Sequence, residues 1–573
     1  MLRKSSPLTE RYTTLELELL ASGIPSYWEG VCVMLDCRPF VERTTLSCRQ
    51  FFPVNMLRQS LSRCLSWFFI LALALGSPAL HPIRDTDYWL KRIRILTEES
   101  HISLGGKLEL GYGERAANNI LMDAKEEEID GSFLNPSNFL PALNFMTVAK
   151  DIRRSPTFQI IQKMPKGAVL HVHDSALISS EYLYENITFR ENLYICRPRD
   201  GLISFRFIRS ANNDTRCTSP MGWELVADLR ANETIAEDVN TLIRDSLTMV
   251  VTDPATAYPN INAVWVAFGN VFAIRRPLLT YLPVFSDLYY QNLVELREDN
   301  VLYAEFRSPF LPLYDLDGNI YGPLETARIS KTSIDRFVND HPDFIGVKLI
   351  YSPLRLVNAT QMDRYLTIAA ALKKEFPEFV IGLDLVGQEE KGEPLIRFAD
   401  KLKAISPDIR LFFHAGETKW NGLSTDENLI DAILLNTTRI GHGYALMKHP
   451  KVLELAKEHE IAIEVNPISN QVLTLVDDLR NHPASFLFAQ DYPVVVSCDD
   501  PGLWGAVGLS YDFYEAFVGI MSRSADIRAL KQLAINSIKY SAMSSDEKIR
   551  AFTMWEEKWT TFISDLVENH SHI

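Results

Sequence analysis

The sequence is poor in basic residues, and this limits the ligands that the protein can bind. Its 573 residues include 58 lysines and arginines against 73 aspartates and glutamates, a formal net charge of -15. Broad nucleic-acid binding needs a basic surface that neutralises phosphates, so we expect no nucleic acid as a partner. No repeat or low-complexity tract is present. The apolar content of 47% is typical of an ordered globular chain, here long enough for more than one domain.

Cysteines are few and unevenly distributed. Four of the seven precede Leu80, and only Cys196, Cys217 and Cys498 lie beyond it. No CxxC pair occurs, which excludes a thiolate zinc site. The HExxH motif of zincin metallopeptidases is also missing, as are the paired HxE and PCxxC elements of the cytidine-type deaminases.

Residues 56–79 have the features of a secretory signal peptide. A basic start is followed by an apolar stretch from Leu65 to Leu75 and a small-residue exit at Ser77–Pro78–Ala79. The stretch is about half of the roughly 20 residues that span a bilayer, so an uncleaved membrane anchor is the weaker alternative. We expect a secreted, extracellular protein with no stable membrane span after signal removal.

Residues 1–55 precede this signal, although a signal normally starts the chain. We interpret Met56 as the working start. Residues 1–55 are then a leader of uncertain status, either an extension of the gene model or an alternative first exon.

Residues 80–160 are predicted to form an N-terminal helical region. Charged helical patterning runs from Asp85 to Phe145, as in Ala124–Lys125–Glu126–Glu127–Glu128. Such a pattern fits a solvated extension packed on the main domain about as well as a subunit contact.

Eight short apolar runs predict a barrel over residues 161–573. Helix-like segments lie between most of the runs, for example Thr360–Phe376, Pro394–Ile405, Glu427–Leu435 and Pro450–His459. In the first run, Ala168 to His173, the side chains of His171 and His173 point to one face because side chains alternate along a strand. Eight parallel strands that alternate with helices close most naturally into a TIM-type (β/α)8 barrel, an α/β fold. The other runs are Val301–Phe306, Phe344–Tyr351, Phe379–Val386, Ile409–His414, Thr438–His442, Ile461–Val465 and Val494–Cys498.

Polar residues gather towards the C-terminal ends of these runs, where barrels of this type carry their catalytic groups. A histidine pair by itself is a weak metal signal, but this shared position strengthens it. Histidine nitrogens with one carboxylate oxygen suit Zn²⁺, with a water completing the site. Zinc lowers the pKa of such a water towards roughly 7. The candidate ligands are His171, His173, His414 and Asp499.

Three further residues are candidates for acting on the substrate. Glu417 lies three residues after His414 and could protonate a ring nitrogen, although a carboxylate at a helix N-terminus would look the same in the sequence. His442 could orient or deprotonate the water, although a single core histidine bonded to a carbonyl is ordinary. Asp500 should point away from Asp499, so that it contacts substrate and water.

A long segment without a barrel strand follows His173 and predicts an insertion at residues 185–255. In an exported chain we expect Cys196 and Cys217 to form a disulfide that closes a surface loop. Six arginines between Arg190 and Cys217 could bind a polyanion such as a glycosaminoglycan, but we favour a solvated, disulfide-braced subdomain. Three sequons fit an exposed segment; they are Asn186, Asn213 and Asn232.

Six motifs carry a resemblance to a known family. They are MPKGAVLHVHDSA, GLDLVG, FFHAGET, TTRIGHGYAL, IEVNPISNQVL and SCDDPGLWGAVGLSYDFYEAF. Together they resemble the adenosine deaminases, most closely the secreted adenosine deaminase-related growth factors of the adenosine deaminase 2 type. The resemblance extends from about Asp85 to the end of the chain.

The resemblance implies a barrel with one Zn²⁺ per subunit that hydrolyses adenosine, and 2′-deoxyadenosine with it, to inosine and ammonia. It implies the four ligands named above, a homodimer built through the N-terminal helices, and a receptor- or glycan-binding role for the insertion. It also implies roles for single residues: Glu417 as proton donor to purine N1, His442 and Asp500 on the water, Gly387 on the purine, Asp174 and Trp265 at the ribose, and Asp384 behind the ligands. A buried aromatic is the ordinary alternative for Trp265.

Two alternatives to an extracellular adenosine deaminase remain open. One is a signalling protein whose insertion binds a receptor or glycan and in which deamination is secondary. The other is a deaminase of adenosine monophosphate, which should need a basic cradle for the phosphate where Asp174 offers a negative charge. Cys498 departs from the family pattern, which has a small hydroxyl residue there; we expect a buried, packing cysteine more than a thiol that competes for metal.

Overall fold

The computed structural model describes residues 86–211 and 214–570. The predicted leader and signal peptide lie outside these described residues. The chain divides into two compact units, Met1–Arg94 and Ile95–Ile573. Within the described ranges the first unit contributes only the start of helix α5 (Thr86–Ile102). No helix in those ranges is long and apolar enough to cross a membrane.

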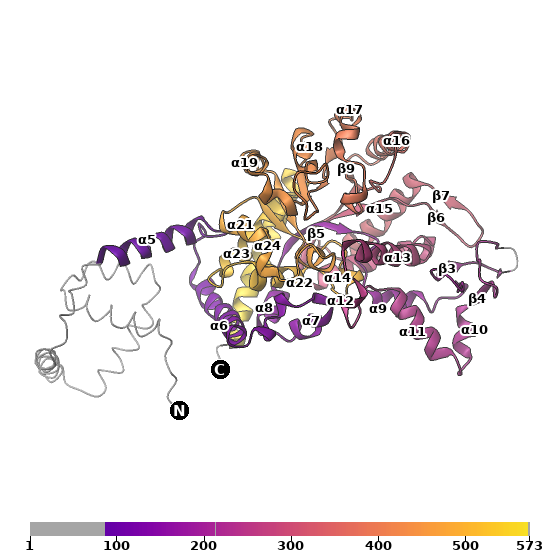
Figure 1. The fold of residues 1–573 in the computed structure, drawn as a ribbon, viewed down its shortest axis with the longest axis horizontal. Coiled ribbons are helices and arrows are strands. Elements are labelled where there is room, and N and C mark those ends of the chain that lie inside the picture. Colours follow the sequence, from indigo (N-terminus) through magenta and orange to yellow (C-terminus); the bar gives the residue numbers. More distant parts are fainter. Residues whose placement is uncertain (1–85, 212–213, 571–573) are drawn as a thin grey trace, which may run out of the picture. The chain divides into compact units, whose positions relative to one another are not determined.

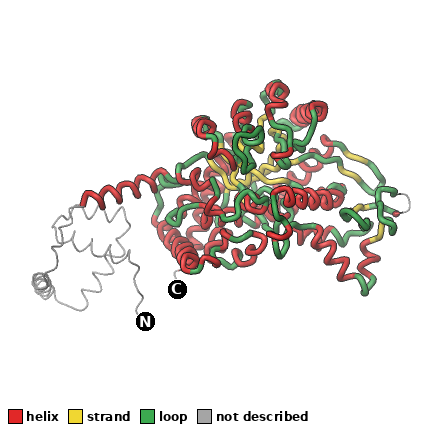
Figure 2. Tube along the Cα trace, viewed as in Figure 1, coloured by secondary structure: helices red, strands yellow, loops and turns green. Residues whose placement is uncertain are grey.

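Two parallel sheets form the centre of the second unit, with helices around them (Figures 1 and 2). Both consist of the predicted apolar runs, and all pairs of neighbouring strands are parallel. The five-stranded sheet has the order β1 (Gly167–His173), β5 (Val301–Ser308), β8 (Gly346–Tyr351), β9 (Val380–Leu383), β10 (Arg410–Leu411). The four-stranded sheet has the order β11 (His414–Ala415), β12 (Arg439–His442), β13 (Ala462–Val465), β14 (Val494–Val496).

The two sheets meet at both of their edges. Between β10 and β11, the backbone N–H of Phe412 donates to Leu383 (3.0 Å) and that of Gly441 donates to the carbonyl of Phe413 (2.8 Å). The predicted single strand Ile409–His414 is therefore two short strands in the structure. At the other edge a parallel bridge joins Val172 of β1 to Asp499, which follows β14. The result is an α/β fold with a curled parallel sheet.

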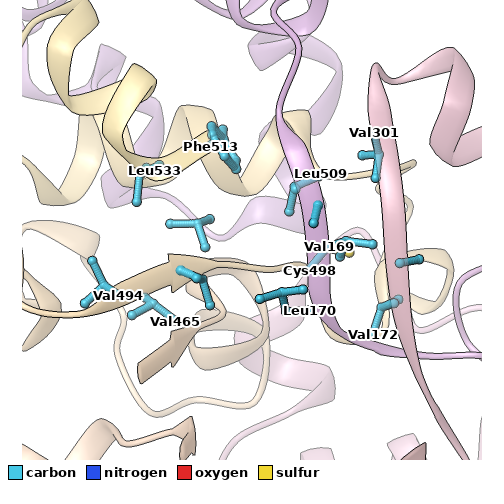
Figure 3. Packing of buried hydrophobic residues seen from close by; sticks show 14 of the residues in the cluster. Val169, Leu170, Val172, Val301, Val465, Val494, Cys498, Leu509, Phe513 and Leu533 are labelled. Carbon is cyan, nitrogen blue, oxygen red and sulfur yellow. The ribbon is translucent and has the colours of Figure 1, made fainter. Parts of the chain in front are cut away.

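The strands are apolar because both of their faces are covered, as is usual in parallel sheets. Every residue of β5 is buried. In Figure 3, side chains of β1, β5, β13 and β14 pack against Leu509, Phe513 and Leu533. Cys498 is a fully buried member of this core, and burial raises the pKa of its thiol well above the usual range. The expectation of a packing cysteine is confirmed.

Helices surround the sheet, and those predicted between the strands lie close to their predicted ranges. For example, α16 (Ala359–Glu375) begins with a capping box in which Asn358 and Gln361 satisfy each other's backbone N–H groups. The other helices of this layer are α12 (Pro254–Ala257), α13 (Ile261–Leu279), α14 (Leu282–Glu298), α15 (Pro323–Asp340), α17 (Ala399–Lys403), α18 (Asn428–Leu434), α19 (Pro450–Glu458), α20 (Pro467–Val472), α21 (Ala484–Ala489), α22 (Ser510–Tyr514), α23 (Ile527–Lys539) and α24 (Ser545–His570).

The predicted N-terminal helices are present as α6 (Tyr112–Leu134), α7 (Phe145–Ile152) and α8 (Pro156–Lys163). Helix α6 packs on the C-terminal helices. Its Glu114 pairs with Lys531 at 2.6 Å and accepts a hydrogen bond from the indole of Trp559 at 2.8 Å. This part of the extension thus packs on the main domain, and the subunit contact stays a prediction.

The insertion after β1 has its own small sheet. Strands β2 (Leu193–Cys196), β3 (Ser204–Phe207) and β4 (Trp223–Leu225) are antiparallel in the order β3-β2-β4, and the predicted disulfide joins Cys196 to Cys217. Asn186 and Asn232 are exposed, and Asn213 lies outside the described residues. The remaining elements nearby are α9 (Ser180–Tyr182), α10 (Val226–Ala231), α11 (Ala236–Ser246), β6 (Leu313–Tyr314) and β7 (Ile320–Tyr321).

Candidate active site

Three histidines and an aspartate from distant parts of the chain meet where the parallel strands end. Nε2 of His171 lies 3.1 Å from Nε2 of His414. Oδ1 of Asp499 lies 3.2 Å from Nε2 of His171 and 3.1 Å from Nε2 of His173. This oxygen is buried and has no hydrogen-bond partner. The four predicted metal ligands are therefore linked through His171 and Asp499. Among the described residues, the compact groups of candidate ligands are His171, His414, His442 and Asp499, and His173, Asp499 and Asp500.

Two carboxylates behind these histidines fix the orientation of their rings. Nδ1 of His171 lies 2.7 Å from Glu464, and Nδ1 of His414 lies 2.7 Å from Asp384. A ring whose Nδ1–H donates to a carboxylate has its lone pair on Nε2. Burial lowers the pKa of His414 to about 4, so this ring is neutral. Both Nε2 atoms can then donate electrons to a cation.

His442 lies in the same cluster, but its hydrogen bonds differ. Ligand atoms of His171, His414, His442 and Asp499 lie within 4.8 Å of one another. Nδ1 of His442, however, lies 3.2 Å from the side-chain amide nitrogen of Asn470. An amide nitrogen only donates, so Nδ1 accepts and Nε2 of the neutral ring carries the hydrogen. That N–H suits a contact to water better than a bond to metal.

Two of the cluster residues have a backbone conformation that L-residues rarely adopt. His442 has φ 61° and Asp499 has φ 58°. Such positions cost free energy and are concentrated at functional sites. Here they turn the side chains at the ends of β12 and β14 towards the cluster.

Two further carboxyl groups, Glu417 and Asp500, lie beside the cluster. Burial, together with the negative charge of Asp499, raises the pKa of both well above the usual range, which favours the protonated form of each carboxyl. Burial alone would raise the pKa of Asp499 as well, but the adjacent rings of His171 and His173 hold it well below its usual value. Oε1 of Glu417 lies 3.7 Å from Nδ1 of His442. The site thus combines a proton donor with a carboxylate anion.

A buried chain of charges beneath the site escaped the sequence-based prediction. Arg307 donates to Glu464 at 2.5 Å and to Asp384 at 3.1 Å, so it links the two carboxylates that hold the histidines. Arg439 donates to Glu464 at 2.6 Å and to Glu305 at 2.5 Å. A signal was present, because Glu305 and Arg439 are charged residues inside apolar strands and are costly to bury unless paired.

The cluster forms one end of a cavity of about 490 Å³. Asp174, Trp265, Gly387 and Glu417 line this cavity, as do His173, His414, His442, Asp499 and Asp500. His171 and Asp384 are fully buried behind its wall. The lining also includes three cations that the sequence-based prediction did not single out, Arg276, Arg355 and Lys391.

The two residues predicted to contact a ribose, Asp174 and Trp265, both line the cavity. The phenol of Tyr289 donates to the side chain of Asp174, and Asn292 donates to its carbonyl at 2.9 Å. Trp265 of α13 is half-buried and contacts Phe268 edge to face, with 5.1 Å between the ring centroids. Asp174 is therefore held in place from α14, while Trp265 offers an aromatic surface.

Comparisons with known proteins agree with this arrangement. The family model described as Adenosine deaminase matches residues 242–554, and that described as Adenosine/AMP deaminase N-terminal matches residues 67–161. Adenosine deaminase of Phlebotomus duboscqi is 45% identical over 490 residues, which are 85% of this chain and 94% of that protein. Adenosine deaminase 2 of Homo sapiens is 41% identical over 479 residues, 83% of this chain and 93% of that protein.

Among solved structures, an amidohydrolase of Burkholderia ambifaria with bound zinc has a similar fold. Its TM-score is 0.50 at 19% identity, over 72% of this chain and 95% of that one. The fold and the buried cluster define a hydrolase with a candidate metal site. The chain belongs to the adenosine deaminase family and is an enzyme of that kind, with adenosine deaminase 2 proteins among its relatives.

Proposed function

We propose that the protein is an extracellular, zinc-dependent adenosine deaminase that converts adenosine, and also 2′-deoxyadenosine, to inosine and ammonia. One observation carries this proposal: the Nε2 atoms of three histidines and an unpartnered oxygen of Asp499 converge at a cavity that Glu417 also lines. The relatives named adenosine deaminase support the substrate.

The residues present fit one Zn²⁺ per subunit. His171, His173, His414 and Asp499 would hold the ion, because their donor atoms lie close together and the two ring nitrogens at 3.1 Å both present lone pairs. Neutral imidazoles and a carboxylate are the donors that Zn²⁺ takes in proteins. Zinc in such a site lowers the pKa of a water towards roughly 7.

The reaction adds water at C6 of the purine and releases ammonia. Glu417 donates a proton to N1, which makes C6 more electrophilic as the C6–O bond forms. The Nε2–H of His442 and the carboxyl of Asp500 hold and orient the attacking water. As the water adds, its second proton passes to Asp500. The C6–N bond then breaks: the amino group takes up this proton and leaves as ammonia, while the new C6 hydroxyl becomes the carbonyl of inosine and returns its proton to Glu417.

The remaining cavity residues bind the nucleoside. The backbone at Gly387 contacts the purine, Asp174 accepts a ribose hydroxyl, and Trp265 packs beside the ribose. Asp384 acts from behind, through the ring of His414. Arg276 and Lys391 give the cavity some positive charge, but the carboxyl of Asp174 disfavours a 5′-phosphate at the same wall.

We also propose that the eight strands form one closed (β/α)8 barrel over residues 161–573, interrupted by the insertion at 185–255. The bridge between Val172 and Asp499, with the hydrogen bond from the backbone N–H of His173 to the carbonyl of Asp499 (2.9 Å), supports closure at one seam. The bonds around Phe412 and Phe413 support the other.

Secretion and a homodimer through residues 80–160 complete the proposal. The signal-like segment at 56–79, the disulfide and the two exposed sequons support export. Of the six arginines between Arg190 and Cys217, five pair with carboxylates: Arg190, Arg197, Arg206, Arg209 and Arg216. Their charge is largely neutralised, so receptor or glycan binding, and any growth-factor activity that follows from it, is secondary to deamination.

Two variants test the proposal by inosine formation and metal content. Glu417→Gln should lower turnover of adenosine by 10²- to 10⁴-fold with zinc retained, and Asp499→Ala should lose zinc and turnover together. The exposed Glu427→Gln is the matched control and should behave like the wild type. Full turnover of Glu417→Gln, or zinc retained by an active Asp499→Ala, contradicts the assigned roles. Growth activity that survives in Glu417→Gln would assign signalling to the insertion.

A further inference from the structure

The loop after β9 holds the backbone that carries Glu417. Glu389 is buried, and its two carboxylate oxygens accept hydrogen bonds from consecutive backbone N–H groups: Oε1 from Gly416 at 3.0 Å and Oε2 from Glu417 at 2.6 Å. Only Ala415 and Gly416 separate His414, a proposed metal ligand, from Glu417, the proposed proton donor. One carboxylate therefore determines where this short segment lies.

Glu389 is itself held from two sides. The side-chain amide of Asn428, at the start of α18, donates to its Oε1 at 2.7 Å. Nη1 of the buried Arg355 lies 3.4 Å from the same oxygen. Nη2 of Arg355 donates to the backbone carbonyl of His414 at 2.6 Å. Arg355 and Glu389 thus hydrogen-bond to the backbone on both sides of Ala415.

The hydrogen bonds to Glu389 stabilise residues 414–417, which have an unusual backbone conformation. Gly416 has φ +74°, and a Cβ on it would lie 2.7 Å from the side chain of Leu429. Both backbone N–H groups that donate to Glu389, those of Gly416 and Glu417, belong to this buried segment. Without the carboxylate they would be left unsatisfied, at a cost of about 1–3 kcal/mol each.

Glu389 also lies two residues after Gly387, the proposed purine contact. Gly387 and Glu417 both line the cavity, whereas Glu389 is buried behind it. A purine held by the backbone of Gly387 and protonated by Glu417 needs a fixed distance between the two. Small displacements of a catalytic group have large effects on rate.

We propose that Glu389 is a positioning residue for the deamination: by binding the backbone N–H groups of Gly416 and Glu417 it fixes the proton donor relative to the purine-binding loop. This inference rests on the role proposed above for Glu417. It requires a carboxylate, because two acceptor oxygens face two donors. A glutamine would turn its NH₂ group towards one of these N–H groups, and an aspartate would fall short by one methylene.

The experiment is a double-mutant cycle of Glu389→Gln and Glu417→Gln, assayed by steady-state kinetics with adenosine and by zinc content. We expect Glu389→Gln to lower kcat by 10- to 100-fold, with KM changed less than threefold and full zinc content. Glu390→Gln is the matched control, because its carboxylate accepts from the hydroxyl of Thr418, at 2.7 Å, and not from the backbone of Gly416 or Glu417; it should lower kcat less than threefold. In the Glu417→Gln background, Glu389→Gln should change the residual rate less than threefold, because coupled residues are not additive.

Three results would overturn the inference: a wild-type kcat for Glu389→Gln, the same fold loss in both backgrounds, or loss of zinc together with activity. Asn428→Asp serves if Glu389→Gln does not fold, because it keeps the acceptor for the backbone N–H of Leu395 but faces Glu389 with an oxygen. It should lower kcat at least threefold at unchanged zinc content, and an unchanged kcat refutes the positioning role. A Glu417→Gln variant with normal turnover would instead overturn the proposed function.

Discussion

Asp384 holds His414 at two points: its Oδ2 lies 2.7 Å from the ring Nδ1, and its Oδ1 accepts the backbone N–H at 2.9 Å. Side chain and main chain of this histidine are therefore fixed by one buried carboxylate. Arg307 in turn binds the carboxylate at 3.1 Å. The orientation of the ring does not depend on a bound ion.

Replacing this carboxylate should weaken metal binding without unfolding the protein. We expect Asp384→Asn to lower zinc affinity by 10- to 100-fold, because the charged acceptor behind a ligating imidazole is lost. Competition with a chromophoric chelator measures this, and circular dichroism checks the fold. Asp408→Asn, an exposed change, is the control. An affinity equal to that of the wild type would show that His414 is not a ligand.

Two glycines with nearly the same backbone separate steric crowding from backbone strain. At Gly416 (φ +74°) an added Cβ would lie 2.7 Å from Leu429, whereas Gly422 (φ +79°) has open space around it. Alanine at 422 should cost about 1–2 kcal/mol from the left-handed conformation alone. Alanine at 416 should cost about 1–3 kcal/mol more from overpacking. Urea unfolding measures both, and equal losses would contradict the packing around Gly416.

Stability should fall with rising pH through one buried acid, Glu295. Burial raises its pKa from 4.5 to about 7, so between these values the folded protein binds a proton that the unfolded chain has lost. The contribution of Glu295 to the free energy of unfolding is then fully present below pH 4.5 and is lost towards pH 7, by at most about 3 kcal/mol. Glu295→Gln should remove this loss, so its advantage over the wild type in urea unfolding grows from pH 5 to pH 8.

The exposed Glu298→Gln on the same helix is the control for this pH dependence. It should keep most of the wild-type slope. A constant difference between Glu295→Gln and the wild type across the pH range would show that Glu295 is ionised in the folded protein.

Removing the disulfide should destabilise the insertion and spare catalysis. Cys196 and Cys217 are separated by 21 residues, and closing a loop of this size stabilises by about 3 kcal/mol. The double serine variant should be cleaved faster by protease within residues 185–255, with adenosine turnover within twofold of the wild type. Loss of turnover with an intact insertion would show that the bridge supports the cavity.

Much of the barrel region and of the cluster could be predicted because both depend on local patterns. Helix α16, predicted as Thr360–Phe376, is found at Ala359–Glu375, since an amphipathic segment with a cap specifies itself. The strands were recognisable as apolar runs, each with polar residues at its end. The break between β10 and β11 at Phe412 and Phe413 could not be predicted, because it depends on how the edges of the two sheets meet.

What escaped prediction depends on contacts between distant residues. Glu389 and Gly416 are joined across 27 positions and Arg307 and Glu464 across 157, and neither pair leaves a periodic signal. The hydrogen bond from Asn470 that determines the tautomer of His442 is of the same kind. Motifs placed His442 at the site, but only coordinates show which of its nitrogens carries the hydrogen.

The bridge between Val172 and Asp499 makes the metal centre a reporter of complete folding. Its partners come from opposite ends of the catalytic region, so a chain still emerging from the ribosome, or one truncated before Asp499, has only part of the ligand set. In the proposed zinc site, metal uptake is thereby deferred until the last strand has docked beside the first. The zinc content of a purified preparation then measures the fraction of molecules in which Val172 and Asp499 have paired.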